Sequence, residues 1–282
     1  MKAILLMKVT SLSFYHKMKR ERMPIMITYE ILKKQIGVIT LNRPDAANAL
    51  SRQLLHELNR YIHKANQDEN IRCILLTGSG EKAFCAGADL KERKQMSDKE
   101  VVETVQLIGN TVSALEKMDM PTIAVMNGVA FGGGLELALG CDIRIMQDNT
   151  QIGLTETSLG IIPGAGGTQR LARLIGVGQA KRLIFTASSI TSKEAYSLGI
   201  IEEMAAQENL FETALKRAET IATNAPIAVQ QAKRAINKGI EVSLQDGLII
   251  EHQCYAQTIE TEDRLEGLRA FSEKRKPTYV GK

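Results

Sequence analysis

Apolar and polar residues follow two different patterns along this chain. In the first part, short apolar runs typical of buried strands recur between segments with helical periodicity. A hairpin is expected at residues 28–33 and 37–41, further strands at 71–77, 122–125 and 141–146, and helices at 51–67 and 98–117. Such strand and helix repetition is typical of a layered α/β domain.

From about residue 168 the pattern becomes almost entirely helical. Helices are expected at residues 168–175, 179–186, 192–198, 210–224, 227–238, 243–258 and 262–272, with one short strand at 200–204. We therefore predict three parts. They are a leader that is disordered or processed (1–22), an α/β core (25–200) and a helical C-terminal region (201–282).

Two glutamates in glycine-rich surroundings are the strongest candidates for chemistry. Glu136 ends the segment Phe131-Gly-Gly-Gly-Leu-Glu136, and Glu156 shortly precedes Ile162-Pro-Gly-Ala-Gly-Gly167. Consecutive glycines let the backbone approach a ligand closely, and free amides at a helix start stabilise an oxyanion. Taken singly, each segment is more often a packing or turn feature, and most glutamates are surface charges. As a pair they predict acid/base chemistry beside a backbone anion site.

Length and charge limit the classes of protein that fit. The chain has 282 residues, 44% of them hydrophobic, which suffices for a sizeable buried core. Its net charge is +4, but residues 1–22 contain six basic residues and one acid, so the remainder is nearly neutral. The body of the protein is therefore not expected to bind polyanions in general. No uncharged stretch reaches membrane-spanning length, so a soluble protein is expected.

The leader allows two interpretations. Its apolar segment at residues 3–7 is too short to cross a membrane, and basic residues stand on both sides of it, unlike in a signal peptide. A mitochondrial presequence and a disordered extension fit about equally well. The protein is accordingly expected in the cytoplasm of a bacterial-type cell, or in the mitochondrial matrix if the leader is a presequence.

The four cysteines, Cys73, Cys85, Cys141 and Cys254, form no CxxC pair and have no metal-ligand spacing. Reduced thiols are the simplest interpretation, and no metal site is expected. Cys85 lies in the glycine-containing segment 84–90, but no histidine is near it in the sequence. A nucleophilic role is therefore disfavoured.

A series of short motifs extends through residues 25–282. In chain order they are Leu41-Asn-Arg-Pro44, Asn48-Ala-Leu50, Ala83-Phe-Cys-Ala-Gly-Ala-Asp-Leu90, Pro121-Thr-Ile-Ala124, Asn127-Gly128, Gly132-Gly-Gly-Leu-Glu-Leu-Ala138, Cys141-Asp-Ile143, Ile162-Pro-Gly-Ala-Gly-Gly-Thr-Gln-Arg-Leu171 and Glu273-Lys-Arg275. Together they resemble the crotonase family, also called the enoyl-CoA hydratase/isomerase superfamily. The combination is far more specific than any single motif.

The resemblance implies a fold and a reaction. The fold would be an α/β catalytic core that forms a spiral of ββα turns (25–200), followed by a helical assembly region (201–282) that mediates trimerisation, with trimers pairing into hexamers. The reaction would be reversible addition of water to a trans-2-enoyl-CoA in fatty-acid or branched-chain acyl-CoA breakdown. Coenzyme A enters only as part of the substrate, and neither a metal nor a redox cofactor is expected.

The resemblance also assigns roles to particular residues. Two backbone amides, those of Ala88 and Gly133, would form the oxyanion hole for the thioester carbonyl. Glu136 and Glu156 would hold the attacking water, which the amide of Gly164 would help to orient.

Further positions match substrate contacts of the family. Within one chain these are Ala47, Ala86, Asp89 and Leu90. Phe271 and Lys274 would reach the CoA of a neighbouring subunit, where phosphates require cationic partners. For the basic run at 274–276, a solvated tail is the alternative.

Several alternatives within the family differ in substrate or partner. Residues 84–93 and 251–268 look most like the methylglutaconyl-CoA hydratase branch, so that substrate is the main alternative to a straight-chain enoyl-CoA. An isomerase would be expected to lack one of the two carboxylates. Animal members of that branch also bind AU-rich RNA through a lysine-rich helix. The corresponding residues 54–68 contain one lysine and one arginine against two acids, which makes RNA binding doubtful.

Overall fold

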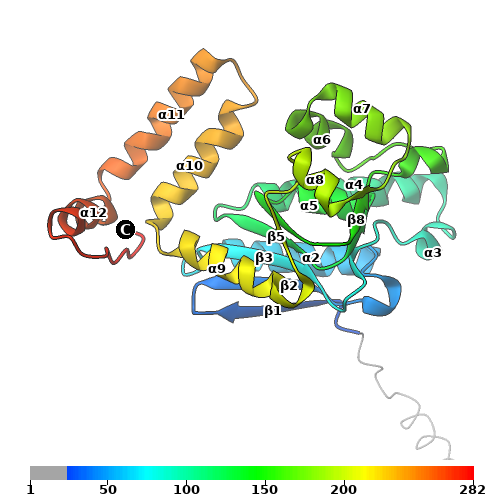
Figure 1. The fold of residues 1–282 in the computed structure, drawn as a ribbon, viewed down its shortest axis with the longest axis horizontal. Helices are drawn as coiled ribbons and strands as arrows, with labels where there is room; N and C mark the ends of the chain where they lie inside the picture. The colour runs from blue at the N-terminus through cyan, green and yellow to red at the C-terminus, as the bar shows by residue number, and fades with distance from the viewer. Residues whose placement is uncertain (1–23) are drawn as a thin grey trace, which may run out of the picture.

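The computed structural model describes residues 24–282, so the interpretation of the leader lies outside the described residues. Within this range no helix is both long and apolar enough to cross a membrane. Two sheets and the helices around them form the body of the molecule, and a helical arm projects from one side of it (Figure 1).

The larger sheet has six strands in the order β1-β2-β3-β5-β7-β10. The first pair is antiparallel, with Ile27 opposite Leu41, as the predicted hairpin requires, and the other pairs are parallel. All five residues of β5 are buried, which is typical of a parallel strand covered on both faces. The strands are β1 (Ile27–Leu32), β2 (Ile36–Leu41), β3 (Cys73–Gly78), β5 (Thr122–Met126), β7 (Ile143–Gln147) and β10 (Glu203–Ala205).

The smaller sheet consists of four short strands in the order β4-β6-β8-β9. They are β4 (Ala83–Cys85), β6 (Val129–Phe131), β8 (Gln151–Gly153) and β9 (Ile190–Thr191). Each of the first three follows a strand of the larger sheet and precedes a helix. This repeat gives the ββα turns that the family resemblance implied. Strands of two or three residues are too short for alternation to be visible, so periodicity did not predict them.

The helices of the body pack against the two sheets and bury their apolar side chains. A large apolar core lies among the sheets and α2, α4 and α5, while α9 covers the other face of the larger sheet with Leu210, Ala214 and Ala218. Ser51 caps α2, and Ser97 with Glu100 forms a capping box on α4. The helices are α2 (Arg52–Asn66), α3 (Leu90–Arg93), α4 (Asp98–Glu116), α5 (Gly133–Leu139), α6 (Gly167–Ile175), α7 (Val177–Phe185), α8 (Ser192–Ser197) and α9 (Leu210–Ala222), with 3-10 turns η1 (Pro44–Ala46), η2 (Glu156–Leu159) and η3 (Gln207–Asn209).

The arm comprises α10 (Pro226–Gly239), α11 (Leu244–Ile259) and α12 (Glu262–Ser272) (Figure 1). Strand β10 and helix α9, which the sequence grouped with the assembly region, pack on the larger sheet instead. The part that projects therefore begins at Pro226. Lys233 ties α10 to the body through the Asp142 carboxylate, at 2.8 Å, and the Met120 carbonyl, at 3.0 Å.

The end of the chain returns to the body and to the arm. Arg72, just before β3, donates hydrogen bonds to the carbonyls of Ala222 and Tyr279. The Asp263 carboxylate of α12 accepts from the amides of Val280 and Gly281. These contacts hold the last residues in a defined position.

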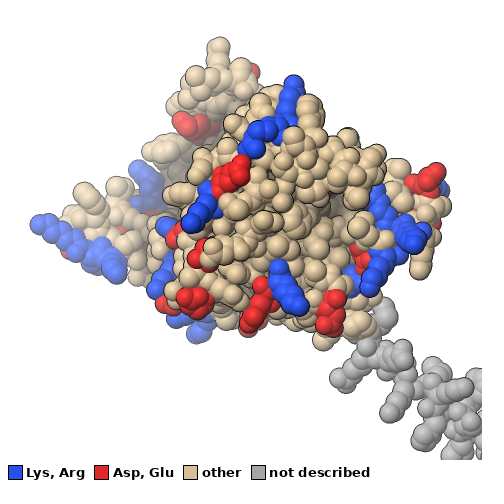
Figure 2. Space-filling model, turned by 45° about the vertical axis from the view of Figure 1, so that its right-hand side comes forward, with Lys and Arg blue, Asp and Glu red and all other residues tan. Residues whose placement is uncertain are grey.

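Charged side chains of both signs are interspersed on the face shown in Figure 2 around a broad area without charge. A basic face suited to nucleic acid is not visible in this view. The distribution agrees with the nearly neutral composition of residues 23–282.

Candidate active site

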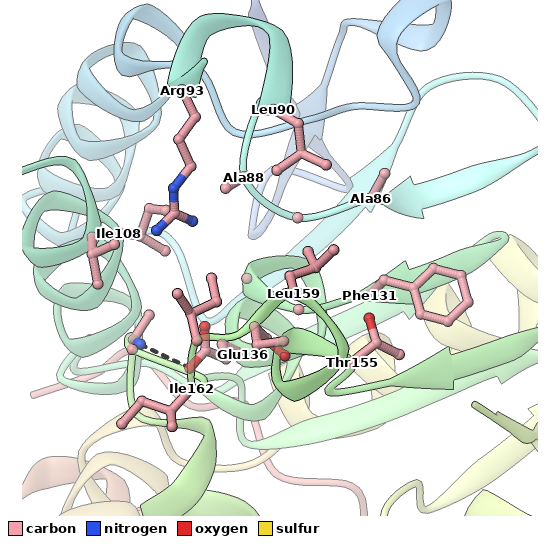
Figure 3. A pocket seen from close by; sticks show the side chains of 18 residues that line it. Ala86, Ala88, Leu90, Arg93, Ile108, Phe131, Glu136, Thr155, Leu159 and Ile162 are labelled. Atoms are coloured by element: carbon pink, nitrogen blue, oxygen red, sulfur yellow. Dashed lines mark hydrogen bonds between the residues drawn. The ribbon is translucent and has the colours of Figure 1, made fainter. Parts of the chain in front are cut away.

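A cavity of about 150 Å³ lies where successive ββα turns meet. Its walls come from the segment after β4, the start of α5, η2, the loop before α6 and the side chains of Val105 and Ile108 on α4 (Figure 3). Leu90, Leu159 and Ile162, which are 59%, 61% and 68% exposed, line it with apolar surface that also faces solvent. Such an opening suits a partly apolar ligand.

Two glycines bring the backbone segments of the site together. A Cβ on Gly134 would lie 2.1 Å from the Cys85 carbonyl oxygen, so only glycine allows α5 to contact β4 this closely. Gly87 has φ +91°, and a Cβ there would lie 2.7 Å from the Phe131 carbonyl oxygen. As a result the backbones at Ala88 and Gly133 are neighbours, since a Cβ on Gly133 would lie 3.7 Å from the Ala88 nitrogen.

The amides of Ala88 and Gly133 are available to a ligand. The Leu50 amide donates to the Gly87 carbonyl, and the Leu50 carbonyl accepts from the Asp89 amide. In this strand-like pairing, the amide of the intervening Ala88 is directed away from Leu50. Gly133 is the first residue of α5, where the amide has no intrahelical partner. Among residues 24–282, no acceptor is bonded to either amide. Both residues line the cavity, as expected for an oxyanion hole.

Glu136 is held in place by two backbone amides. Its side chain is 3% exposed, and its Oε1 accepts from the nitrogens of Ala165 and Gly167, each at 2.8 Å. A Cβ on Gly167 would lie 2.9 Å from the same oxygen, so glycine is needed for this approach. Burial raises the pKa of Glu136, while the two amides and the charge of Arg170 oppose that change. The carboxyl group is thus fixed at the cavity, and its second oxygen accepts no hydrogen bond from these two amides.

Glu156 lies at the start of η2 and is half-buried. Burial raises its pKa to about 7, the charge of Glu136 adds to this, and its own backbone amide and Arg93 lower it. Within the described part of the chain, its buried Oε2 has no hydrogen-bond partner. Gly132, with φ +49°, leaves room for it, since a Cβ there would lie 2.9 Å from Glu156 Oε1. Two carboxyl groups with different environments therefore face one cavity.

Three further residues named from the sequence, Ala86, Leu90 and Gly164, also line the cavity. Two others support its walls without lining it. Asp89 caps α3 by accepting from the amides of Lys91 and Glu92, and it pairs with Arg43 at 2.7 Å. Ala47, with φ +49°, accepts from the Ala86 amide and so positions the segment after β4.

Phe271 belongs to α12 of the projecting arm (Figure 1), Lys274 follows that helix, and neither lines the cavity of its own chain. Phe271 is 87% exposed. Their expected contact was with the CoA of a neighbouring subunit, so it stays a prediction.

Cys85 is buried beneath the site and is not a wall of the cavity. Burial raises the pKa of its thiol to about 12, so the sulfur stays protonated near neutral pH. The side chain packs in the apolar core, in agreement with the expectation against a nucleophile.

Arg93 lines the cavity but was not among the residues chosen from the sequence. It ends α3, a helix of only four residues, which is too short to show periodicity. The available signal was spacing, because Leu90 and Arg93 stand three residues apart and share one helical face.

Comparison with known proteins gives consistent matches. The Enoyl-CoA hydratase/isomerase family model matches residues 32–282. YngF of Bacillus subtilis (strain 168), named for that family, is 52% identical over 255 residues, covering 90% of this chain and 98% of the relative. The mitochondrial methylglutaconyl-CoA hydratase of Mus musculus is 46% identical over 250 residues, covering 87% of this chain and 80% of the relative.

A solved structure agrees in fold as well as in sequence. The crystal structure of enoyl-CoA hydratase from Bacillus anthracis is 50% identical, has a TM-score of 0.90 and covers 92% of this chain and 100% of that chain. The protein therefore belongs to the enoyl-CoA hydratase/isomerase family, the crotonase superfamily.

Proposed function

We propose that the protein catalyses reversible addition of water across the 2,3 double bond of an enoyl-CoA thioester. The observation that carries this proposal is the convergence of two unbonded amides and two carboxyl groups on one cavity. The amides of Ala88 and Gly133 donate hydrogen bonds to the carbonyl oxygen of the thioester. Because negative charge grows on that oxygen as water attacks, their stabilisation is larger in the transition state than in the ground state.

The two carboxyl groups divide the proton transfers. Glu136 is stabilised as a carboxylate by two amides, and it takes a proton from water while the water oxygen bonds to C3. The electron pair of the double bond moves toward the thioester oxygen. Glu156, with a pKa of about 7, then gives its proton to C2. Since each carboxyl group influences the other, the pair titrates as a unit.

The family also contains isomerases, which move a double bond without adding water. That reaction needs one group to remove and return a proton. The presence of a second carboxyl group at Glu156, buried and unbonded at Oε2, favours addition of water over isomerisation.

We further propose that the arm mediates self-association into trimers or hexamers. Several of its large apolar side chains are exposed in the single chain. They are Ile236 (68%), Ile240 (68%), Leu244 (80%), Leu265 (53%), Leu268 (59%) and Phe271 (87%). An exposed apolar surface of this kind is typical of a protein interface.

Enoyl-CoA hydration is tested by the ultraviolet absorbance of the conjugated thioester. Purified protein should reduce this absorbance with at least one of crotonyl-CoA, longer 2-enoyl-CoAs and 3-methylglutaconyl-CoA, without added metal or nucleotide. The Glu136→Gln/Glu156→Gln double variant is the matched control for contaminating activity. Unchanged absorbance with every substrate would contradict the proposal.

A further inference from the structure

Arg93 presents a positive charge to the cavity without a partner. Figure 3 shows its side chain extending from α3 into the pocket, toward Ile108. No carboxylate in residues 24–282 forms an ion pair with it, and none of its guanidinium nitrogens donates a hydrogen bond to an acceptor there; only its backbone nitrogen is bonded, to the Asp89 carbonyl of α3. A partly desolvated guanidinium with five unused donors is costly unless a ligand satisfies it.

The two acidic residues closest to Arg93 in sequence are engaged elsewhere. Asp89 pairs with Arg43 at 2.7 Å and accepts from two amides of α3. The Glu92 carboxylate accepts from the Arg52 amide at 3.1 Å. The charge of Arg93 therefore stays available within the cavity, and it also acts on Glu156, whose pKa it lowers.

Arg93 also lies where two spaces adjoin. A second space of about 10 Å³ adjoins the first, and Ala88, Arg93, Val105 and Ile108 belong to the walls of both. Arg93 is thus part of the wall between the cavity and a neighbouring space that holds roughly one water.

We infer that Arg93 recognises a carboxylate at the far end of the acyl group, so that the substrate class is a short enoyl-CoA with a terminal carboxylate. The inference rests on the proposed hydratase function. Arginine matches a carboxylate with two parallel hydrogen bonds, which a straight-chain acyl group cannot offer. Neutralising Arg93 would also remove its effect on Glu156 and favour the protonated form that delivers the proton.

The test compares two substrates of nearly equal shape. Glutaconyl-CoA ends in a carboxylate, and 5-methylhex-2-enoyl-CoA has an isopropyl group in its place. The unaltered protein should have the higher kcat/KM for glutaconyl-CoA. Arg93→Met should lower that value about 10- to 100-fold, the range of a charged hydrogen bond, and leave or raise the value for the isopropyl substrate. Arg93→Lys should recover part of the loss.

Lys94→Met is the matched control, because this exposed lysine is adjacent to Arg93 but does not line the cavity. It should leave the ratio of the two kcat/KM values unchanged. An equal loss with both substrates in Arg93→Met would show that Arg93 contacts the CoA portion or acts only through Glu156, and would overturn the inference while leaving hydration intact.

Affinity gives a readout that does not depend on turnover. Calorimetry should show that glutaryl-CoA binds more tightly than 5-methylhexanoyl-CoA and that Arg93→Met abolishes the difference. Equal affinities in the unaltered protein would overturn the inference. If neither unsaturated substrate is hydrated but the affinity difference is present, the proposed function fails and the carboxylate site stands.

Discussion

The two glutamates of the cavity lie in different environments. Glu136 is nearly inaccessible and bonded to two amides, whereas Glu156 is half-buried with one oxygen unbonded. Replacing either with Gln keeps the shape and removes the proton-transfer group. We expect each single variant to lower kcat by about 10²- to 10⁴-fold with a smaller effect on KM.

The double variant distinguishes a joint role from two separate roles. When two groups act as a unit, the loss of kcat in the double variant is much smaller than the product of the losses in the two single variants. Steady-state kinetics of all three variants should therefore show strong non-additivity. Nearly normal turnover in Glu136→Gln would contradict the mechanism with two carboxyl groups.

The raised pKa of Glu156 predicts a pH dependence of the rate. In the proposed mechanism, hydration requires the protonated form of Glu156. We therefore expect kcat/KM to decrease as pH rises through about 7. Glu156→Gln should lack this limb in whatever activity it retains. A profile that is flat from pH 6 to 8 in the unaltered protein would contradict the assignment of Glu156 as the acid.

The same shift predicts a pH dependence of stability. The folded protein binds the Glu156 proton with a pKa of about 7, above the ordinary value of 4.5 for a free glutamate side chain. Between these values the folded state holds more protons than the unfolded state, so its stability falls as pH rises through this window. Thermal unfolding should show the unaltered protein losing stability relative to Glu156→Gln between pH 4.5 and 7. Parallel curves would contradict this prediction.

At the scale of elements, the contact between β4 and α5 brings the amides of Ala88 and Gly133 close together. Gly134→Ala places a methyl group against the Cys85 backbone and must separate the two elements. Overpacking of this kind costs about 1–3 kcal/mol. We expect a lower urea midpoint and a loss of kcat, because the Ala88 and Gly133 amides move apart.

Gly178→Ala is the matched control for this variant. Gly178 lies in α7, where an added Cβ meets nothing within 4 Å. The change should be neutral or should stabilise the protein by about 0.4–1 kcal/mol. Equal urea midpoints and equal kcat in both variants would show that the close contact is not required.

The predictability of these elements depended on their length. The hairpin β1-β2 and helices α2 and α4 carry enough residues for periodicity to appear, and they lie within a few residues of the expected ranges. Strands β4, β6, β8 and β9 and helix α3 have two to four residues and depend on tertiary contacts, so no local pattern indicated them.

The site could be predicted where its chemistry leaves a mark in the sequence. Two sequence features indicated the site: glycines that permit close backbone contact, and a pair of glutamates. They led to Ala88, Gly133, Glu136 and Glu156, which the structure brings to one cavity. Arg93 carried no such mark. Arg93 stands out because its guanidinium has no ion-pair or hydrogen-bond partner in the described residues, and this depends on the folded structure.

At the scale of the whole molecule, the exposed apolar side chains of the arm predict that the protein self-associates. Light scattering should report a trimer or hexamer, and dilution to monomers should weaken CoA binding if Phe271 and Lys274 complete a neighbouring site. Lys274→Gln should lower CoA affinity and flatten its salt dependence, since screening acts on attraction to phosphate. Lys276→Gln, nearby in the same exposed tail, is the control. A fully active monomer would contradict this view.

The contacts of the last residues have a practical consequence for handling the protein. Arg72 fastens the Tyr279 carbonyl to the body, and Asp263 holds the Val280 and Gly281 amides against α12. A purification tag fused directly to Lys282 begins inside this network, because the Lys282 carbonyl accepts from the Asp263 amide. Such a fusion should carry a flexible spacer, and carboxypeptidase trimming that passes Tyr279 should loosen the arm before it affects the catalytic cavity.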